Sequence, residues 1–293
     1  MKTENVTIIG AGPGGIAAAI QLKRWGWEPL LLEKEHIGGL LINANLVENY
    51  PGFPQGISGP ELVRLFKAQM QRIGVEVTLE EVLELNYNQN FTLKTSNREL
   101  SSRFVIIASG TRPKPFADFE IPADSAKRVF YEIHHLADVK GKKIAIVGGG
   151  DAAFDYALNL ARENEVAILN RSQKRKCLPL LWERCQKSSR ITYFENTTIT
   201  GMQRSVEGLD IKCKNAQGDW ELRVDYVIFA IGRIPQASFL SGQLREKSSK
   251  LEREGLLYFV GDVKNDIYRQ ATISVGEGIR AAMRICRISE DND

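Results

Sequence analysis

Two short glycine motifs contain residues of the types and spacing that bind phosphate. The first is Gly10-Ala-Gly12-Pro-Gly14-Gly15, and the second, far along the chain, is Gly148-Gly-Gly150-Asp-Ala-Ala153. In such motifs the first glycine makes a tight strand-to-helix turn, the second lets backbone approach a pyrophosphate, and the third position allows close helix packing. The phosphate then lies at a helix N-terminus. Each motif follows an apolar run, residues 6–9 and 143–147, so the sequence predicts two dinucleotide sites.

The first motif is the more specific of the two, because an acidic residue follows it at the right spacing. Residues 13–26 have the pattern of a helix, and residues 29–33 form an apolar run that ends in Glu33. A ribose-binding carboxylate is expected at the end of the second strand, about twenty residues after the motif. The alternative for each motif is a glycine-rich turn without a ligand. Two dinucleotide sites in one chain suggest a flavoprotein that takes electrons from a nicotinamide.

The composition is that of a globular protein with two domains. The chain has 293 residues, 43% of them hydrophobic, and a net charge of +3, which is too small to imply a nucleic-acid partner. The region from Arg162 to Lys176 is locally basic and would suit an anionic partner or a phosphate. The sequence has no signal peptide and no apolar run long enough to span a membrane, so we expect a cytoplasmic enzyme without a membrane partner.

The four cysteines, Cys177, Cys185, Cys213 and Cys286, are scattered, with no C-x-x-C pair and no spacing typical of metal ligands. We therefore expect no metal site, and buried, reduced thiols at each position. Cys177 and Cys185 are predicted to share one helical stretch, two turns apart. That separation is about 12 Å by helical rise, which exceeds the reach of a disulfide.

The remaining pattern predicts an α/β fold with two Rossmann-like domains, the second inserted in the first. Residues 142–170 repeat the order strand, glycine turn, helix and strand of the N-terminal region. The last segment is too short to stand alone and is expected to return to the first domain. The predicted FAD-binding domain is 1–113 with 236–293, and the NAD(P)-binding domain is 114–235. Other predicted helices are 59–73 and 271–288, and other predicted strands are 75–85, 91–95, 104–108, 190–195, 210–214, 224–230 and 257–260.

The order of motifs resembles that of the low-molecular-weight thioredoxin reductase family over essentially the whole chain. The shared segments are Gly38-Gly-Leu-Leu with residues 47–53, the crossover at residues 107–113, and Gly261-Asp262 with residues 267–271. The resemblance implies a homodimer that binds FAD. By the same resemblance, Glu33 takes ribose hydroxyls, and Asp262 takes ribityl or pyrophosphate-side hydroxyls. The alternative for Asp262 is a turn-capping acid. The implied FAD residues are Gly10, Gly12, Pro13, Gly14, Gly15, Glu33, Lys34, Gly38, Gly39, Leu40, Asn49, Val82, Ala108, Ser109, Gly110, Gly261, Asp262, Arg269, Gln270 and Ala271.

The second motif would bind the nicotinamide dinucleotide, with NADPH favoured and NADH open. Members of this scaffold that use NADPH carry His-Arg-Arg and a later Arg, where this chain has Asn170-Arg171-Ser172 and Lys176. Because no acid stands at this strand end, Arg171 and Lys176 would be able to bind a 2′-phosphate. The alternatives are a solvated basic face and a decayed site supplied by a protein donor. The residues of this predicted site are Gly148, Gly150, Asp151, Ala152, Ala153, Arg171, Lys176 and Gly232.

The chain departs from the thioredoxin reductase pattern at the redox dithiol. The place of its C-x-x-C is held by Tyr131-Glu-Ile-His134, with His135 next, and thiol exchange needs two thiols. Residues 130–142 and 150–159 instead resemble the thioredoxin-reductase-like ferredoxin/flavodoxin NADP reductases. His134 and His135 are weak catalytic candidates, and a linker or surface role is favoured for both.

The leading hypothesis is an FAD-dependent NAD(P)H oxidoreductase that passes electrons to ferredoxin, flavodoxin or a small molecule. A second hypothesis is a thioredoxin or other disulfide reductase that uses non-standard thiols, such as Cys177 or Cys185, or an external electron donor. A third is a flavin-binding redox sensor with a decayed nicotinamide site. The possible protein partners are thus acidic redox proteins of the ferredoxin, flavodoxin or thioredoxin type.

Overall fold

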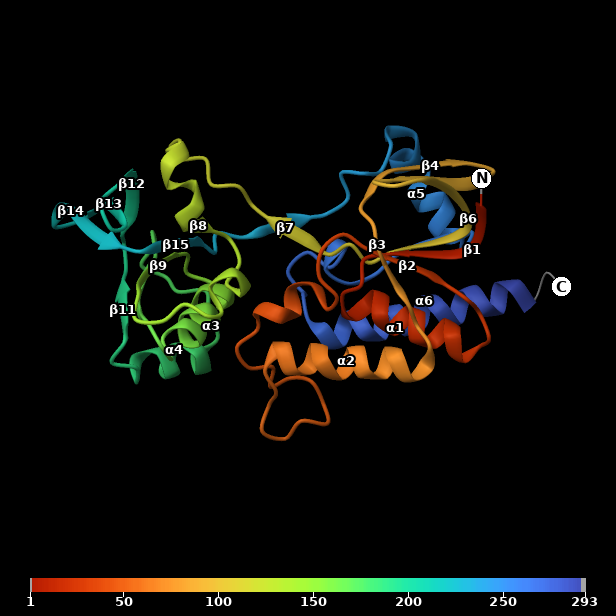
Figure 1. Ribbon diagram of the computed structural model, residues 1–293, viewed down its shortest axis with the longest axis horizontal. Helices are drawn as coiled ribbons and strands as arrows, with labels where there is room; N and C mark the ends of the chain where they lie inside the picture. Colours follow the sequence, from red (N-terminus) through yellow and green to blue (C-terminus); the bar gives the residue numbers. More distant parts are fainter. Residues whose placement is uncertain (1, 291–293) are drawn as a thin grey trace. The chain divides into compact units, whose positions relative to one another are not determined.

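The computed structural model describes residues 2–290, which divide by their contacts into two compact units (Figure 1). Unit 1 comprises the described residues up to Ile42, Val47–Arg112 and those from Ile234 onward. Unit 2 comprises Asn43–Leu46 and Pro113–Arg233. Both units are Rossmann-like, which confirms the predicted α/β fold class.

The sheet of unit 1 joins a parallel part to an antiparallel part. The parallel order is β3 (Val77–Leu79), β2 (Leu30–Glu33), β1 (Lys2–Ile9), β6 (Glu99–Ile107) and β17 (Leu257–Phe259). β5 (Asn90–Thr95) and β4 (Val82–Asn88) continue from β6 as an antiparallel meander. The first half of β6 pairs with β5 and its second half with β17, so a strand from the end of the chain completes the parallel part.

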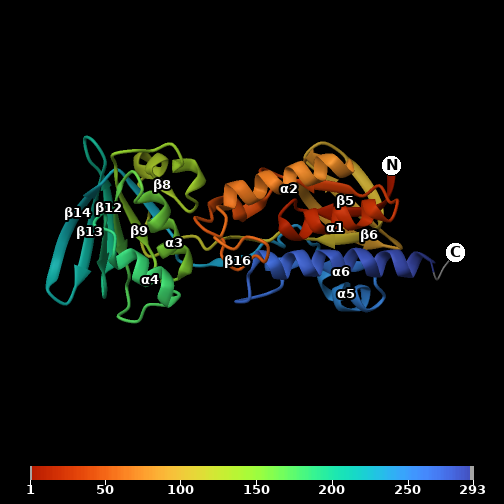
Figure 2. The same ribbon diagram turned by 90° about the horizontal axis from the view of Figure 1, so that it is seen from below.

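Four α-helices belong to unit 1: α1 (Pro13–Arg24), α2 (Gly59–Ile73), α5 (Gly242–Arg253) and α6 (Ala271–Glu290). α1 and α6 lie side by side, as Figure 2 shows. At their closest approach a Cβ atom on Gly278 would stand 2.1 Å from the carbonyl oxygen of Gly14. Two short 3₁₀ turns, η1 (Gly39–Asn43) and η4 (Gly261–Val263), complete the region. The sheet and α5 share a core that includes Phe91, Leu244 and Leu257.

Unit 2 has a fully parallel sheet in the order β11 (Ile191–Phe194), β10 (Glu165–Leu169), β9 (Lys143–Val147), β15 (Tyr226–Phe229) and β8 (Val129–Phe130). α3 (Asp151–Leu160) and α4 (Pro179–Gln186) pack on it around Phe154. A separate antiparallel sheet contains β12 (Thr198–Arg204), β13 (Leu209–Asn215) and β14 (Gly218–Val224). Two further 3₁₀ turns are η2 (Ala123–Arg128) and η3 (His134–Leu136), and the crossover strands β7 (Thr111–Pro113) and β16 (Arg233–Pro235) pair with each other.

Several predicted elements were wrong in detail. The strand predicted over 75–85 is two strands, because the chain breaks at Glu80, whose buried carboxylate accepts a hydrogen bond from Thr95 (2.8 Å) and pairs with Arg98. The prediction that one helix holds both Cys177 and Cys185 was also wrong, since α4 begins only at Pro179. α5, β12 and β14 were not predicted. Within residues 2–290 no helix is both long and apolar enough to cross a membrane.

The contact between α1 and α6 gives a test of the packing of unit 1. Gly278→Ala would force the two helices apart, and we expect a loss of about 1 to 3 kcal/mol in the free energy of unfolding, the usual scale of overpacking. Gly276→Ala on the same helix is the matched control, because nothing lies within 4 Å of its added Cβ. It should be neutral or slightly stabilising, as expected for alanine in a helix. Denaturant unfolding of both variants measures the difference, and equal stabilities would contradict this packing.

Candidate dinucleotide sites

The carboxyl ends of four strands meet at one edge of the unit 1 sheet. Ile9 of β1 is in register with Leu32 of β2 and Ile107 of β6, and Ile107 is in register with Phe259 of β17. The predicted FAD segments follow these positions directly: the first glycine motif, Glu33, residues 108–110 and residues 261–262. Open parallel sheets bind their ligands at this edge.

The first glycine turn is so tight that two of its glycines have no room for a side chain. A Cβ on Gly15 would lie 1.9 Å from the carbonyl oxygen of Gly10, and a Cβ on Gly10 would lie 2.5 Å from that of Ala108. Gly12 is different, since nothing lies within 4 Å of its missing Cβ. Gly12 also caps α1 without any side-chain hydrogen bond, and Pro13 is the first helical residue. The open space beside uncapped N–H groups fits a pyrophosphate.

Glu33 is held in place at the end of β2 and is only 8% exposed. One carboxylate oxygen accepts the N–H of Ala11 (2.8 Å) and the other accepts the N–H of Glu35 (3.0 Å). Each oxygen keeps a further lone pair, which suits a ribose hydroxyl. Val82 begins β4 two residues after Glu80, whose N–H donates to the Glu33 carbonyl. Lys34 is exposed beside this carboxylate.

The segment from Gly38 to Phe53, which carries several predicted FAD residues, is bonded to the same edge. The N–H of Gly38 donates to the carbonyl of Ala11 at 2.7 Å, and Gly39 and Leu40 begin η1. Asn49, farther along this loop, donates to the side chain of Gln270 at 2.7 Å. The structure therefore brings together two predicted FAD residues that lie far apart in sequence.

The C-terminal predicted residues also gather near the start of α6. Asp262 is half-buried in η4, and Arg269, Gln270 and Ala271 lead into the helix. The sequence analysis missed Glu277, whose carboxylate accepts the N–H of Gly261 (2.7 Å) and the side-chain amide of Asn265 (3.0 Å). Glu277 thereby fixes the loop that carries Asp262. Its place two turns into a helix gave no signal in the sequence.

The second glycine turn repeats this arrangement within unit 2. Val147 of β9 is in register with Leu169 of β10 and Phe229 of β15, so the turn, residues 170–176 and residues 230–232 leave one edge together. A Cβ on Gly148 would lie 2.4 Å from the carbonyl oxygen of Ala230, while nothing lies within 4 Å of one on Gly150. Gly150 caps α3 without a side-chain hydrogen bond.

Some residues beside this second glycine turn already make hydrogen bonds within the protein. The carboxylate of Asp151 accepts the N–H of Leu178 at 2.7 Å, and the N–H of Lys176 donates to the carbonyl of Gly149 at 2.8 Å. Ala153 is fully buried, whereas Ala152 and the side chains of Arg171 and Lys176 are exposed. These contacts hold residues 170–178 beside the second glycine motif.

Glu132, in the segment predicted to stand in place of a C-x-x-C, lies in a hydrogen-bonded cluster of unit 2. The carboxylate of Glu132 accepts hydrogen bonds from Asn43 and from the Tyr156 hydroxyl, each at 2.9 Å, and pairs with Arg233. Burial raises the pKa of Tyr156, and the charge of Glu132 raises it further, so the phenol stays protonated. Tyr131 accepts the N–H of Phe116 at 3.0 Å.

The two candidate histidines lie next to this Glu132 cluster. His134 donates its backbone N–H to the side-chain oxygen of Asn43 at 3.0 Å, and its ring is 3.9 Å from the ring of His135 between centroids. Both residues belong to η3, in the segment between β8 and β9. Their part in the reaction stays a prediction.

All four cysteines are free thiols in poor environments for thiolate chemistry. Burial raises the pKa of Cys185 to about 12 and that of Cys213 to about 11, and it also raises the pKa of Cys177 and of Cys286. Cys177 is half-buried and the other three are buried. A raised pKa leaves little thiolate at neutral pH, and the thiolate is the attacking species.

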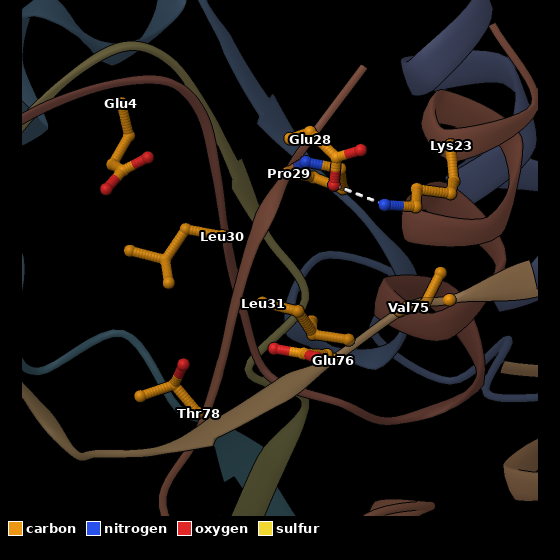
Figure 3. A pocket seen from close by; sticks show the side chains of 10 residues that line it. Glu4, Lys23, Glu28, Pro29, Leu30, Leu31, Val75, Glu76 and Thr78 are labelled. Atoms are coloured by element: carbon orange, nitrogen blue, oxygen red, sulfur yellow. Dashed lines mark hydrogen bonds and ion pairs between the residues drawn. The ribbon is translucent and has the colours of Figure 1, made fainter. Parts of the chain in front are cut away.

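A cavity of about 340 Å³ opens at the other end of the unit 1 sheet. It lies at the amino ends of β2 and β3, where Leu30, Leu31 and Glu76 line it and Lys23 pairs with Glu28 (Figure 3). The glycine turn and Glu33 lie at the carboxyl ends of the strands. This cavity is therefore distinct from the candidate dinucleotide site.

Comparisons with known proteins agree on one family. The family model described as pyridine nucleotide-disulphide oxidoreductase matches residues 4–278. A thioredoxin reductase of Chlamydia pneumoniae is 32% identical, over 97% of this chain and 98% of that protein. Among solved structures, the thioredoxin reductase of T. acidophilum has a TM-score of 0.85 at 27% identity and covers 99% of both chains. That of Lactococcus lactis has a TM-score of 0.84 at 26% identity, covering 98% of this chain and 99% of the other.

The two open glycines allow each candidate site to be blocked separately. Gly12→Leu and Gly150→Leu would each place a side chain in space that the protein leaves free, where backbone is expected to meet a pyrophosphate. We expect Gly12→Leu to fold but to lose its flavin. Gly150→Leu should keep its flavin but lose reduction by NAD(P)H.

Flavin content by absorbance and anaerobic flavin bleaching measure the two effects, and each variant is the control for the other. Full flavin retention in Gly12→Leu, or unchanged bleaching in Gly150→Leu, would contradict the corresponding site.

Proposed function

Because the chain belongs to the pyridine nucleotide-disulphide oxidoreductase family, in its thioredoxin reductase-like branch, we propose that it is an FAD-dependent oxidoreductase that takes electrons from NAD(P)H. The observation that carries the proposal is the pair of glycine turns, each with an open glycine at an uncapped helix N-terminus. The family uses FAD and NAD(P)H, and two such turns suit two dinucleotides.

Unit 1 would hold FAD. Its pyrophosphate would lie at Gly12 and the start of α1, with the two ribose hydroxyls on Glu33. Asn49, hydrogen-bonded to Gln270, would position the loop beside the flavin, and Glu277 would position Asp262 through Gly261. A bound flavin supplies the chemistry of hydride acceptance and onward electron transfer.

Unit 2 would hold the nicotinamide dinucleotide at Gly150 and the start of α3. Hydride transfer needs the two reacting rings held in position and requires no acid or base from the protein. The residues of unit 2 therefore act by binding and orientation. Arg171 supports a choice of NADPH, since its exposed guanidinium would form charge-assisted hydrogen bonds with a 2′-phosphate.

Similarity to thioredoxin reductases favours a disulfide as the electron acceptor over ferredoxin or flavodoxin. The net reaction would convert NADPH, a proton and a disulfide into NADP⁺ and two thiols. The chain's own thiols are poor intermediates, because burial raises the pKa of Cys185 and Cys213 far above neutrality. We therefore propose that a disulfide acceptor, carried by thioredoxin or a small molecule, is reduced without a dithiol of this chain.

Ferredoxin or flavodoxin remains the second candidate acceptor. The observation in its favour is the missing C-x-x-C, since the segment predicted to replace it carries the Glu132 cluster and no thiol. The exposed cations of residues 171–176 would suit an acidic partner. We also propose a homodimer in the cytoplasm. The homodimer follows the family resemblance, and the four free thiols fit a reducing compartment.

The proposed route without chain thiols predicts that cysteine removal leaves turnover largely intact. The variant with Cys177, Cys185, Cys213 and Cys286 all changed to serine should keep at least about half of the wild-type rate. Some stability should be lost, because hydroxyls replace buried thiols. NADPH oxidation with thioredoxin, with a small aromatic disulfide and with flavodoxin measures the rate for each acceptor class.

Single Cys177→Ser and Cys185→Ser variants serve as controls for that experiment. Loss of disulfide reduction in either one, with ferricyanide reduction unchanged, would show that the chain uses a relocated thiol. Turnover with flavodoxin alone would instead support the second candidate.

A further inference from the structure

The loop between β10 and α4 is held in shape by its own polar groups. The side-chain oxygen of Asn170 accepts the N–H of Ser172 (3.2 Å), and its amide donates to the hydroxyl of Tyr193 (2.9 Å). The Ser172 hydroxyl donates to the carbonyl of Lys174 at 2.8 Å. At the far end, Lys176 is bonded through its backbone to Gly149. The four cations of this loop are therefore presented on a fixed backbone beside the second glycine motif.

Among these cations, Arg175 lies over an aromatic ring. Its guanidinium carbon lies 4.1 Å from the centroid of the Trp182 ring. That ring is fixed in turn by edge contacts with Tyr193 (5.0 Å) and Phe154 (5.9 Å). Among the described residues, no ion pair involves Arg171, Lys174, Arg175 or Lys176.

We infer that Arg175, stacked on Trp182, is a further residue, beside Arg171, that selects a nucleotide with a 2′-phosphate. This inference rests on the proposed nicotinamide site. A stacked guanidinium uses only its face for the ring, and its in-plane N–H groups stay available for two oxygens of one phosphate. A lysine cannot do both. Arg175 thus adds a two-pronged cation to the charges of Arg171 and Lys176, the two residues predicted from the sequence to bind a 2′-phosphate.

Pre-organisation gives the physical reason for assigning specificity to Arg175. A mobile arginine or lysine loses rotamer freedom when it binds a phosphate, which weakens its contribution. Arg175 has already lost that freedom in the stack with Trp182. Residues 170–176 themselves contain no carboxylate that would repel a 2′-phosphate.

The test measures binding by calorimetry on the flavin-loaded full chain. The probes are adenosine 2′,5′-bisphosphate and adenosine 5′-monophosphate, which differ only in the 2′-phosphate and do not react with flavin. Arg175→Ala should weaken the bisphosphate about tenfold or more, the scale of a charge-assisted contact, and leave the monophosphate within about twofold. Arg175→Lys should recover less than half of the lost binding free energy for the bisphosphate.

Lys174→Ala is the matched control, because it removes the same charge from the same loop and its side chain makes no contact that the inference uses. It should weaken the bisphosphate by no more than about threefold. If Arg175→Ala and Lys174→Ala weakened bisphosphate binding equally, the effect would come from the general charge of the loop. If Arg175→Ala lost the binding of both probes, Arg175 would contact the adenosine or be needed for folding. Either result overturns the inference.

Failure of the proposed function would look different. If the wild-type protein bound neither probe and NADPH left its flavin oxidised, the nicotinamide site itself would be absent. If NADPH and NADH reduced the flavin equally well, only the assignment of Arg175 would fall.

Discussion

The placement of both candidate sites depends on two strand-to-helix turns in which backbone packs directly against backbone. In the first, Gly15 approaches the carbonyl of Gly10 so closely that any Cβ would clash, and in the second Gly148 approaches Ala230 in the same way. Each turn also places one glycine with free space around it, Gly12 or Gly150, at the start of a helix that has no side-chain cap. The parallel register of the neighbouring strands brings the other predicted cofactor residues to the same edge. This backbone geometry is what supports the two proposed anion sites.

The clearest departure from the thioredoxin reductase pattern is the missing C-x-x-C. The Glu132 cluster satisfies its buried polar groups with one another, through Tyr156, Asn43 and Arg233. The remaining cysteines lie elsewhere, and burial disfavours their thiolate forms. The similarity to thioredoxin reductases therefore supports the cofactors more strongly than it supports a chain-borne dithiol relay. An acceptor that takes electrons without such a relay reconciles the two observations.

The sequence predicted what depends on local spacing and missed what depends on tertiary contact. The position of Glu33 at the end of β2 was predictable, because a strand end at a set distance from a glycine motif is a local pattern. The break at Glu80 was not, since it depends on Thr95 and Arg98 across a hairpin. β12 and β14 lie in a small sheet with exposed polar faces, and α5 has few apolar residues, so none of the three gave a clear period.

The side chains that position the candidate sites were hidden for the same reason. Glu277 accepts a hydrogen bond from Gly261, and Arg175 stacks on Trp182. In both pairs the two residues are not neighbours in the sequence.

The most direct test of the account counts the electrons that the protein accepts. Under the proposed function, FAD is the single redox group, so anaerobic titration with dithionite or NADPH should end after two electrons per FAD. A chain with a redox-active disulfide would take four, because reducing a disulfide to two thiols consumes two more. Complete bleaching of the flavin at one equivalent, with no further uptake, is the result that the account predicts. Uptake of four electrons per FAD would contradict it.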